Sequence, residues 1–250
     1  MKVLAGGCRV YGQEDGPVST NGNWTARTVI SKGTGAEHIT QTVSTYTAGL
    51  SPAVVNPNAE EALYIAAGSG ICHIDGFDYP ISQGAAIFIP PGAVYSIENT
   101  GVDSIRIVSA CCPEDPQRHI VENPPAADGG SRSNLLVHEN DREAIRAGKD
   151  RQFRYLVNAE LDCKQITQFA GWIPPSKAPI HYHTYEEGIY ILEGHGVVHA
   201  DDDSCEFGPG SSVYFPIGVR HCVENPGASV IKLLGAFYPS GSPAVAYEDD

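Results

Sequence analysis

The sequence predicts an all-β protein built from two related modules, and two observations support this fold class. Glycine and proline, 27 and 18 of the 250 residues, separate short runs rich in valine, isoleucine, tyrosine, phenylalanine and threonine. This spacing is typical of many short strands joined by tight turns, as in a sandwich or barrel. The second observation is an internal repeat at a fixed offset of 126 residues, which indicates two copies of one structural unit.

The repeat is carried mainly by residues that shape turns. Glu61 recurs as Glu187, and Tyr64 recurs as Tyr190. The other pairs are Gly68/Gly194, Gly84/Gly210, Pro90/Pro216, Gly92/Gly218, Glu98/Glu224, Asn99/Asn225, Gly101/Gly227 and Pro113/Pro239. Because glycine, proline and asparagine fix turn geometry, we expect the same turns in both modules.

Strands are expected where β-branched and aromatic residues cluster between these turns. In the first module these runs are residues 39–46, 61–67, 85–89 and 105–110. In the second module they are residues 165–170, 188–192, 197–200, 212–215 and 230–237. A helix is expected over residues 141–147, because Asn140 or Asp141 can cap its first turn and Gly148 can end it.

These elements divide the chain into three parts. Residues 1–113 form an N-terminal module, residues 114–150 a linker with the short helix, and residues 151–250 a C-terminal module. The linker is polar and contains Asn123-Pro124-Pro125, which does not suit a central strand.

The composition excludes several classes of function. With 30 acidic and 16 basic residues and a formal net charge of −14, the chain would repel a nucleic-acid backbone. No apolar run approaches the roughly 18 residues that span a bilayer, and the first residues lack the apolar stretch of a secretory signal. The seven cysteines show no repeated spacing, as is typical of reduced thiols. We therefore expect a cytoplasmic protein that binds a small-molecule substrate, with no nucleic-acid or membrane partner.

Four residues of the second module have the chemistry of a metal site. In His181-x-His183 both imidazoles face one side of a strand, because side chains alternate with a period of two. Glu187 lies on the same face if the strand continues, and His221 follows 34 residues later. Three imidazoles and one carboxylate suit iron, manganese, cobalt, nickel or zinc better than calcium. Ile189 and Ile191 share the face of Glu187, so we expect them to line an apolar pocket.

The first module lacks this ligand set. Tyr95 stands opposite His221 in the repeat, and the histidine pair is matched by the region around Asn56 and Asn58. Amide oxygens are weak ligands, and a phenol is protonated at neutral pH. We therefore expect one metal ion per chain and a structural role for the first module.

These residues resemble the two sequence motifs of the cupin superfamily. The first runs His181-x-His183-x-x-x-Glu187-x6-Gly194, and the second runs Gly210-x5-Pro216-x-Gly218-x-x-His221-x-x-x-Asn225. The first module resembles the same pattern without the histidines. The resemblance implies a bicupin: two tandem jelly-roll β-barrels, with a metal ion held inside the C-terminal one. It also implies a homodimer, since cupins often dimerise.

Three functions are compatible with this resemblance. The first is an Fe(II)- or Mn(II)-dependent dioxygenase, with His181, His183, Glu187 and His221 as ligands and Glu187 as a possible catalytic base. The second is a non-redox metal enzyme: an isomerase, lyase, decarboxylase or relative of ureidoglycine aminohydrolase. The third is a binding or storage cupin without turnover. His195 and His199 are expected to be exposed or hydrogen-bonded rather than ligands.

Overall fold

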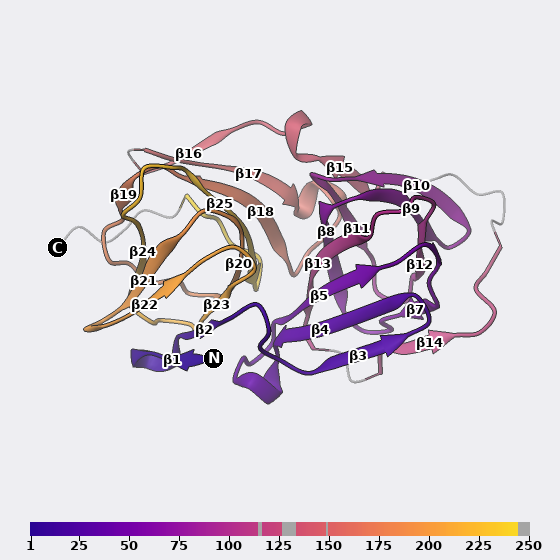
Figure 1. Cartoon of the computed structure of the whole chain (residues 1–250), viewed down its shortest axis with the longest axis horizontal. Helices are drawn as coiled ribbons and strands as arrows, with labels where there is room; N and C mark the ends of the chain where they lie inside the picture. Colours follow the sequence, from indigo (N-terminus) through magenta and orange to yellow (C-terminus); the bar gives the residue numbers. More distant parts are fainter. Residues whose placement is uncertain (115–116, 127–133, 149, 245–250) are drawn as a thin grey trace.

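The computed structural model describes all residues except 115–116, 127–133, 149 and 245–250. Two β-barrels lie side by side, each formed by two packed sheets (Figure 1). The predicted all-β class with tandem barrels is therefore confirmed. Within the described residues, no helix is long and apolar enough to cross a bilayer. Parts of the expected linker, and the last six residues of the expected C-terminal module, lie outside the described residues.

In the described residues, a seven-stranded and a six-stranded sheet form the N-terminal barrel. The larger sheet has the order β15 (Leu136–His138), β11 (Ala85–Ile89), β8 (Glu60–Ala67), β13 (Ile105–Cys112), β5 (Thr40–Tyr46), β4 (Trp24–Ile30) and β3 (Val18–Asn21). The smaller sheet has the order β10 (Phe77–Ser82), β9 (Ser69–Ile74), β12 (Val94–Asn99), β7 (Ala53–Val55) and β14 (His119–Val121), with β6 (Gly49–Leu50) also paired to β12.

The C-terminal barrel repeats this plan. Its larger sheet, over the described residues, has the order β1 (Lys2–Val3), β2 (Arg9–Tyr11), β23 (Ser212–Phe215), β20 (Glu186–Glu193), β25 (Ile231–Tyr238), β18 (Thr167–Ile173), β17 (Arg151–Val157) and β16 (Ile145–Ala147). Its smaller sheet has the order β19 (Ser176–Lys177), β24 (His221–Asn225), β21 (Gly196–Ala200) and β22 (Asp203–Phe207).

The two barrels exchange strands. Strand β2, near the N-terminus, pairs with β23 of the C-terminal barrel, with Val10 opposite Val213. Strand β15 pairs in turn with β11 of the N-terminal barrel, with Val137 opposite Ala86. Residues 2–11 thus contribute to the C-terminal barrel although the sequence assigns them to an N-terminal module, and the expected linker supplies β14 and β15 to the N-terminal barrel. Sequence patterns identify strands but not their distant partners, so the exchange could not be predicted.

The prediction of a helix over residues 141–147 is wrong. A 3-10 turn, η3 (Glu139–Asp141), is followed by strand β16, whose residue Ile145 pairs with Phe153 of β17. The local capping signals favoured a helix, but the hydrogen bonds and packing available beside β17 favour an extended chain. The other short turns are η1 (Ala5–Gly7), η2 (Lys32–Thr34) and η4 (Ala159–Leu161).

An apolar core continues from one barrel into the other. Tyr64 and Ile87 of the N-terminal barrel belong to the same buried cluster as Leu156, Tyr214 and Leu234 of the C-terminal barrel. A second buried cluster fills the interior of the C-terminal barrel, around the strands that carry the histidines. Strand β20 carries Glu187. The shared core and the exchanged strands hold this strand between the interior of its barrel and the interface with the other barrel.

Candidate metal site

The backbone fixes the positions of the three histidines. His181 and His221 form an antiparallel bridge, in which the N–H of each donates to the carbonyl of the other at 3.0 and 2.8 Å. The carbonyl of His183 accepts from the N–H of Gly218 at 2.9 Å. Gly218 has φ +75°, a left-handed conformation that glycine adopts at low cost, so the second motif can turn back toward the first. The two motifs are thereby held face to face.

The side chains of all four predicted ligands converge inside the C-terminal barrel. The ligand nitrogens of His181, His183 and His221 lie within 4.8 Å of one another. One carboxylate oxygen of Glu187, Oε2, lies 3.5 Å from Nε2 of His183 and 3.5 Å from Nε2 of His221. Glu187, His183 and His221 are buried, while His181 is partly exposed at the mouth.

Hydrogen bonds set the tautomers of two imidazoles. Nδ1 of His181 lies 3.0 Å from the carbonyl of Pro179, and Nδ1 of His221 lies 2.8 Å from the carbonyl of Val219. A carbonyl can only accept, so Nδ1 carries the proton and Nε2 presents its lone pair. Nδ1 of His183 is buried without a hydrogen-bond partner in the described structure. The donor set therefore fits a divalent ion held by imidazole nitrogens and one carboxylate oxygen.

Burial sets the charges of the site. Burial, with a smaller effect from His221, lowers the pKa of His181 to about 3. Burial also lowers the pKa of His183. Burial alone would raise the pKa of Glu187, but its interactions with His221 and the other nearby histidines more than offset this, so its pKa is below the usual value. At neutral pH these imidazoles are neutral and the carboxylate is ionised, which is the protonation state that metal ligands need.

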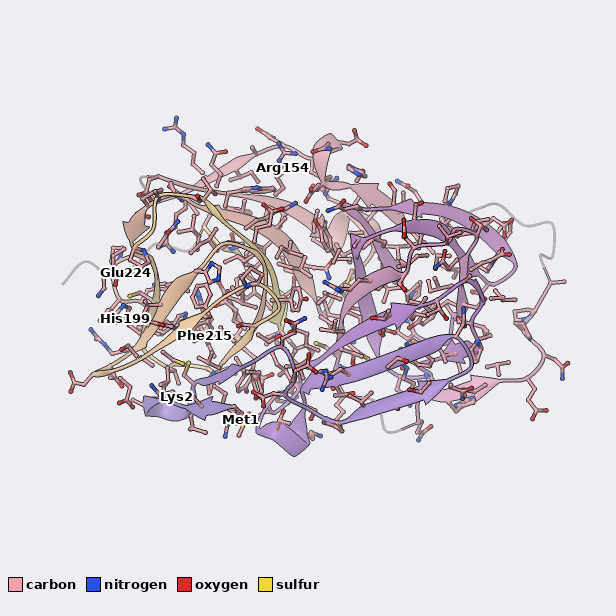
Figure 2. All side chains as sticks on the ribbon, in the orientation of Figure 1. Met1, Lys2, Arg154, His199, Phe215 and Glu224 are labelled. Atoms are coloured by element: carbon pink, nitrogen blue, oxygen red, sulfur yellow. The ribbon has the colours of Figure 1, made fainter. Side chains whose placement is uncertain are left out.

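Aromatic rings pack against two of the candidate ligands. Phe215 stacks on His221 with ring centroids 3.8 Å apart, and Tyr185 stacks on His183 at 4.9 Å. Figure 2 shows Phe215 in the interior of the C-terminal barrel. Sequence analysis missed both rings, although Phe215 directly precedes the proline of the second motif and could have been assigned to the barrel interior by strand alternation.

A small apolar cavity adjoins the four residues. Its volume is about 80 Å³, far below the roughly 300–1,000 Å³ of pockets for drug-sized ligands. The lining beyond the four residues is mostly apolar and includes Phe153, Phe169, Ile173, Ile189, Val223, Leu233 and Phe237. Ile189 lines the cavity as expected, whereas Ile191 is buried in the core and does not. Arg151 and Gln152, which sequence analysis did not single out, also line the cavity.

The other histidines of the second module lie away from this site. Nε2 of His199 lies 2.7 Å from a carboxylate oxygen of Glu224, and Figure 2 shows both side chains at the outer side of the barrel. His195 is exposed. Neither residue lines the cavity, in agreement with the expectation that they are not ligands.

The cupin domain family matches residues 46–111 and 172–237, which together make up just over half of the chain. The chain therefore belongs to the cupin family, and its two matched domains are tandem. The two matches begin 126 residues apart, which is the offset of the internal repeat.

Solved structures of other two-barrel cupins share this fold. A putative glyoxylate-induced protein from Pseudomonas aeruginosa is 18% identical, with a TM-score of 0.73 over 92% of this chain and 88% of that chain. The YlbA protein from E. coli is 16% identical, with a TM-score of 0.74 over 95% of this chain and 93% of that chain. A variant of oxalate decarboxylase from B. subtilis is 15% identical, with a TM-score of 0.76 over 93% of this chain and 78% of that chain. At these identities the likeness is one of fold.

Among curated proteins, an uncharacterized protein from Methanocaldococcus jannaschii is 40% identical over 65 residues. The match covers 26% of this chain and 52% of that protein. The chain thus spans about half the length of this relative.

Proposed function

We propose that the protein is a metal-dependent cupin enzyme of the dioxygenase type that acts on a small organic substrate. The observation that carries this proposal is the convergence of three imidazoles and one carboxylate on an apolar cavity. When bound, an Fe(II) or Mn(II) ion would supply a redox-active centre with coordination positions left for exogenous ligands.

The residues around the ion would have separate roles. His181, His183, Glu187 and His221 would hold it, and the apolar walls would exclude bulk water from the reacting groups. Among the described residues that line the cavity, Glu187 is the one carboxylate. It is therefore the candidate for proton transfer. Because the lining is mostly apolar and offers few acid–base groups, it suits a reaction that depends on the metal ion and on the exclusion of water.

A non-redox reaction is the second candidate, because Arg151 brings a positive charge to the cavity wall. A guanidinium favours an anionic substrate such as a carboxylate. One of the structures with the same fold is named an oxalate decarboxylase, and a decarboxylase or lyase acting on a small acid would use the same four ligands. No separate observation favours the third candidate, which is binding without turnover.

Metal analysis of the untagged protein tests the proposal. Protein purified with and without oxygen would be assayed by plasma mass spectrometry beside the His181→Ala/His221→Ala variant. The matched control is His195→Ala/His199→Ala, which removes two imidazoles outside the site. We expect about one ion per chain in wild type and in this control, and loss from the first variant.

The identity of the ion, together with the reaction that the protein catalyses, then distinguishes the candidates. Iron or manganese, followed by oxygen uptake with small enols, phenols or diols, supports the dioxygenase. Zinc or nickel, with turnover of small acids and no oxygen uptake, favours the non-redox enzyme. Wild-type protein without metal, or a first variant that keeps its metal, would overturn the proposed centre.

A further inference from the structure

The N-terminal barrel contains a counterpart of the candidate metal site. Glu61 lies on β8 where Glu187 lies on β20. Tyr95 pairs with Val54 across β12 and β7, as His221 pairs with His181 in the other barrel.

This pairing corrects the alignment expected from the sequence. Val54 and Asn56, not Asn56 and Asn58, occupy the places of the two motif histidines. The carbonyl of Asn56 accepts from the N–H of Gly92 at 2.8 Å, as the carbonyl of His183 accepts from Gly218. The loop before the motif glutamate is one residue longer in the N-terminal barrel, so the repeat offset is 126 at the glutamate and 127 at the residues that precede this loop.

The side chains at these places still converge on the carboxylate. Nδ2 of Asn56 donates to Oε2 of Glu61 at 2.7 Å, and the hydroxyl of Tyr95 donates to the same oxygen at 2.9 Å. In the C-terminal barrel, His183 and His221 likewise approach a single oxygen of Glu187. The geometry of a metal centre is thus retained around Glu61, although its neighbours donate hydrogen bonds instead of lone pairs.

A guanidinium completes this cluster. Nη1 of Arg118 lies 3.3 Å from Oε1 of Glu61, and Nη2 donates to the hydroxyl of Tyr95 at 2.8 Å. Burial would lower the pKa of Arg118, but Glu61 and the neighbouring groups raise it further, so the side chain keeps its charge. The position 126 residues later is Ala244, so the C-terminal barrel has no arginine at that position.

We propose that Arg118 is the cation of the N-terminal barrel and that it closes a latent site for a divalent transition ion. Glu61 is almost fully buried, and a buried carboxylate needs a compensating positive charge. A metal ion supplies that charge in a loaded cupin centre, whereas Arg118 supplies it here. Arg118 thereby both repels a second cation and makes the N-terminal barrel independent of metal.

Engineered ligands test this proposal. In a His181→Ala/His221→Ala background, which removes the C-terminal ligands, Val54, Asn56 and Tyr95 would all be replaced by histidine. This variant would be compared with the same protein carrying Arg118→Met. Co(II) binding would be followed by visible absorption and by metal content after gel filtration, with circular dichroism as the check on folding.

With Arg118 retained, we expect Co(II) binding at least about tenfold weaker than with Arg118→Met, which should bind about one ion per chain. Equal binding by the two proteins would show that Arg118 does not block the site. Absence of binding in a folded Arg118→Met protein would show that no latent site exists. Both results would overturn the proposal.

Wild-type background provides a second test if the engineered proteins do not fold. Glu61→Gln and Arg118→Met should each lower the urea midpoint, and the double variant should lower it by clearly less than the sum. Additive effects would mean that the two side chains are not a compensating pair, and would overturn the assignment of Arg118 as the cation.

Discussion

Glu60 and Glu186 occupy equivalent positions, 126 residues apart, and each reaches across the interface to cap a loop of the other barrel. The carboxylate of Glu186 accepts from three successive backbone N–H groups, those of Glu37, His38 and Ile39, at 3.0–3.2 Å. The carboxylate of Glu60 accepts from the N–H groups of Lys164 and Gln165 at 3.0 and 2.7 Å. The two loops are also one repeat apart, so the contact is reciprocal.

This contact explains a cluster that otherwise resembles a second cation site. Glu37, His38 and Glu186 come close enough to hold an ion. The Glu186 carboxylate, however, is already satisfied by backbone N–H groups and by the hydroxyl of Tyr214 at 3.0 Å. We therefore assign Glu186 a structural role at the interface.

Replacing Glu186 by glutamine should destabilise the protein by about 2 kcal/mol, since hydrogen bonds to a charged group each contribute roughly 1.5–3 kcal/mol. The amide keeps one acceptor oxygen but turns an N–H₂ group toward backbone donors. Urea unfolding measures the change. Glu206→Gln, on the exposed face of β22, is the matched control and should leave the midpoint unchanged. Equal midpoints for the two variants would argue against the capping role.

The two barrels should unfold as one unit, because they exchange strands and share a core. The chain has two tryptophans, with Trp24 on β4 and Trp172 on β18, one in each barrel. Trp24→Phe and Trp172→Phe each leave one fluorescent reporter. The urea transition of each variant should be the same by fluorescence and by circular dichroism, whichever barrel carries the reporter. A fluorescence transition separated from the circular dichroism transition would indicate independent domains.

Gly235 lets an aromatic ring pack against the cavity wall. It lies opposite Phe169 on the neighbouring strand, and a Cβ atom there would come within 2.2 Å of the Phe169 ring. Gly235→Ala should therefore cost about 1–3 kcal/mol through overpacking. Gly227→Ala, where the nearest atom would be 3.4 Å away, is the control. Thermal unfolding compares the two, and a harmless Gly235→Ala would contradict the packing argument.

Acid should destabilise the metal-free protein. An unfolded histidine binds a proton near pH 6.5, whereas the partly buried His181 binds one only near pH 3. Between these values the unfolded state holds more protons, so the free energy of unfolding decreases as the pH falls from about 6.5 toward 3. The pKa of His183 is lowered in the same direction.

Chelator-treated protein, unfolded in urea at several pH values, tests this expectation. His181→Gln removes one of the titrating groups and should show a shallower dependence on pH over that range. If the two proteins lost stability in parallel, the titration of His181 would not contribute to the effect.

The sequence alone determined the all-β class, the two-barrel organisation and the set His181, His183, Glu187 and His221. These features depend on local signals: turn residues at fixed spacing, and the alternation of side chains along a strand. The same signals failed at residues 141–147, where capping residues suggested a helix but pairing with β17 gives strand β16.

The tertiary structure alone decided which distant segments meet. The exchange of β2 and β15 and the contact of Arg118 with Glu61 join residues far apart in the chain. No periodicity encodes such partners, because they are selected by the shape and charge of surfaces that exist only once both barrels have formed. The one-residue shift that places Val54 and Asn56 at the histidine positions likewise follows from loop length and strand register, which pairing fixes.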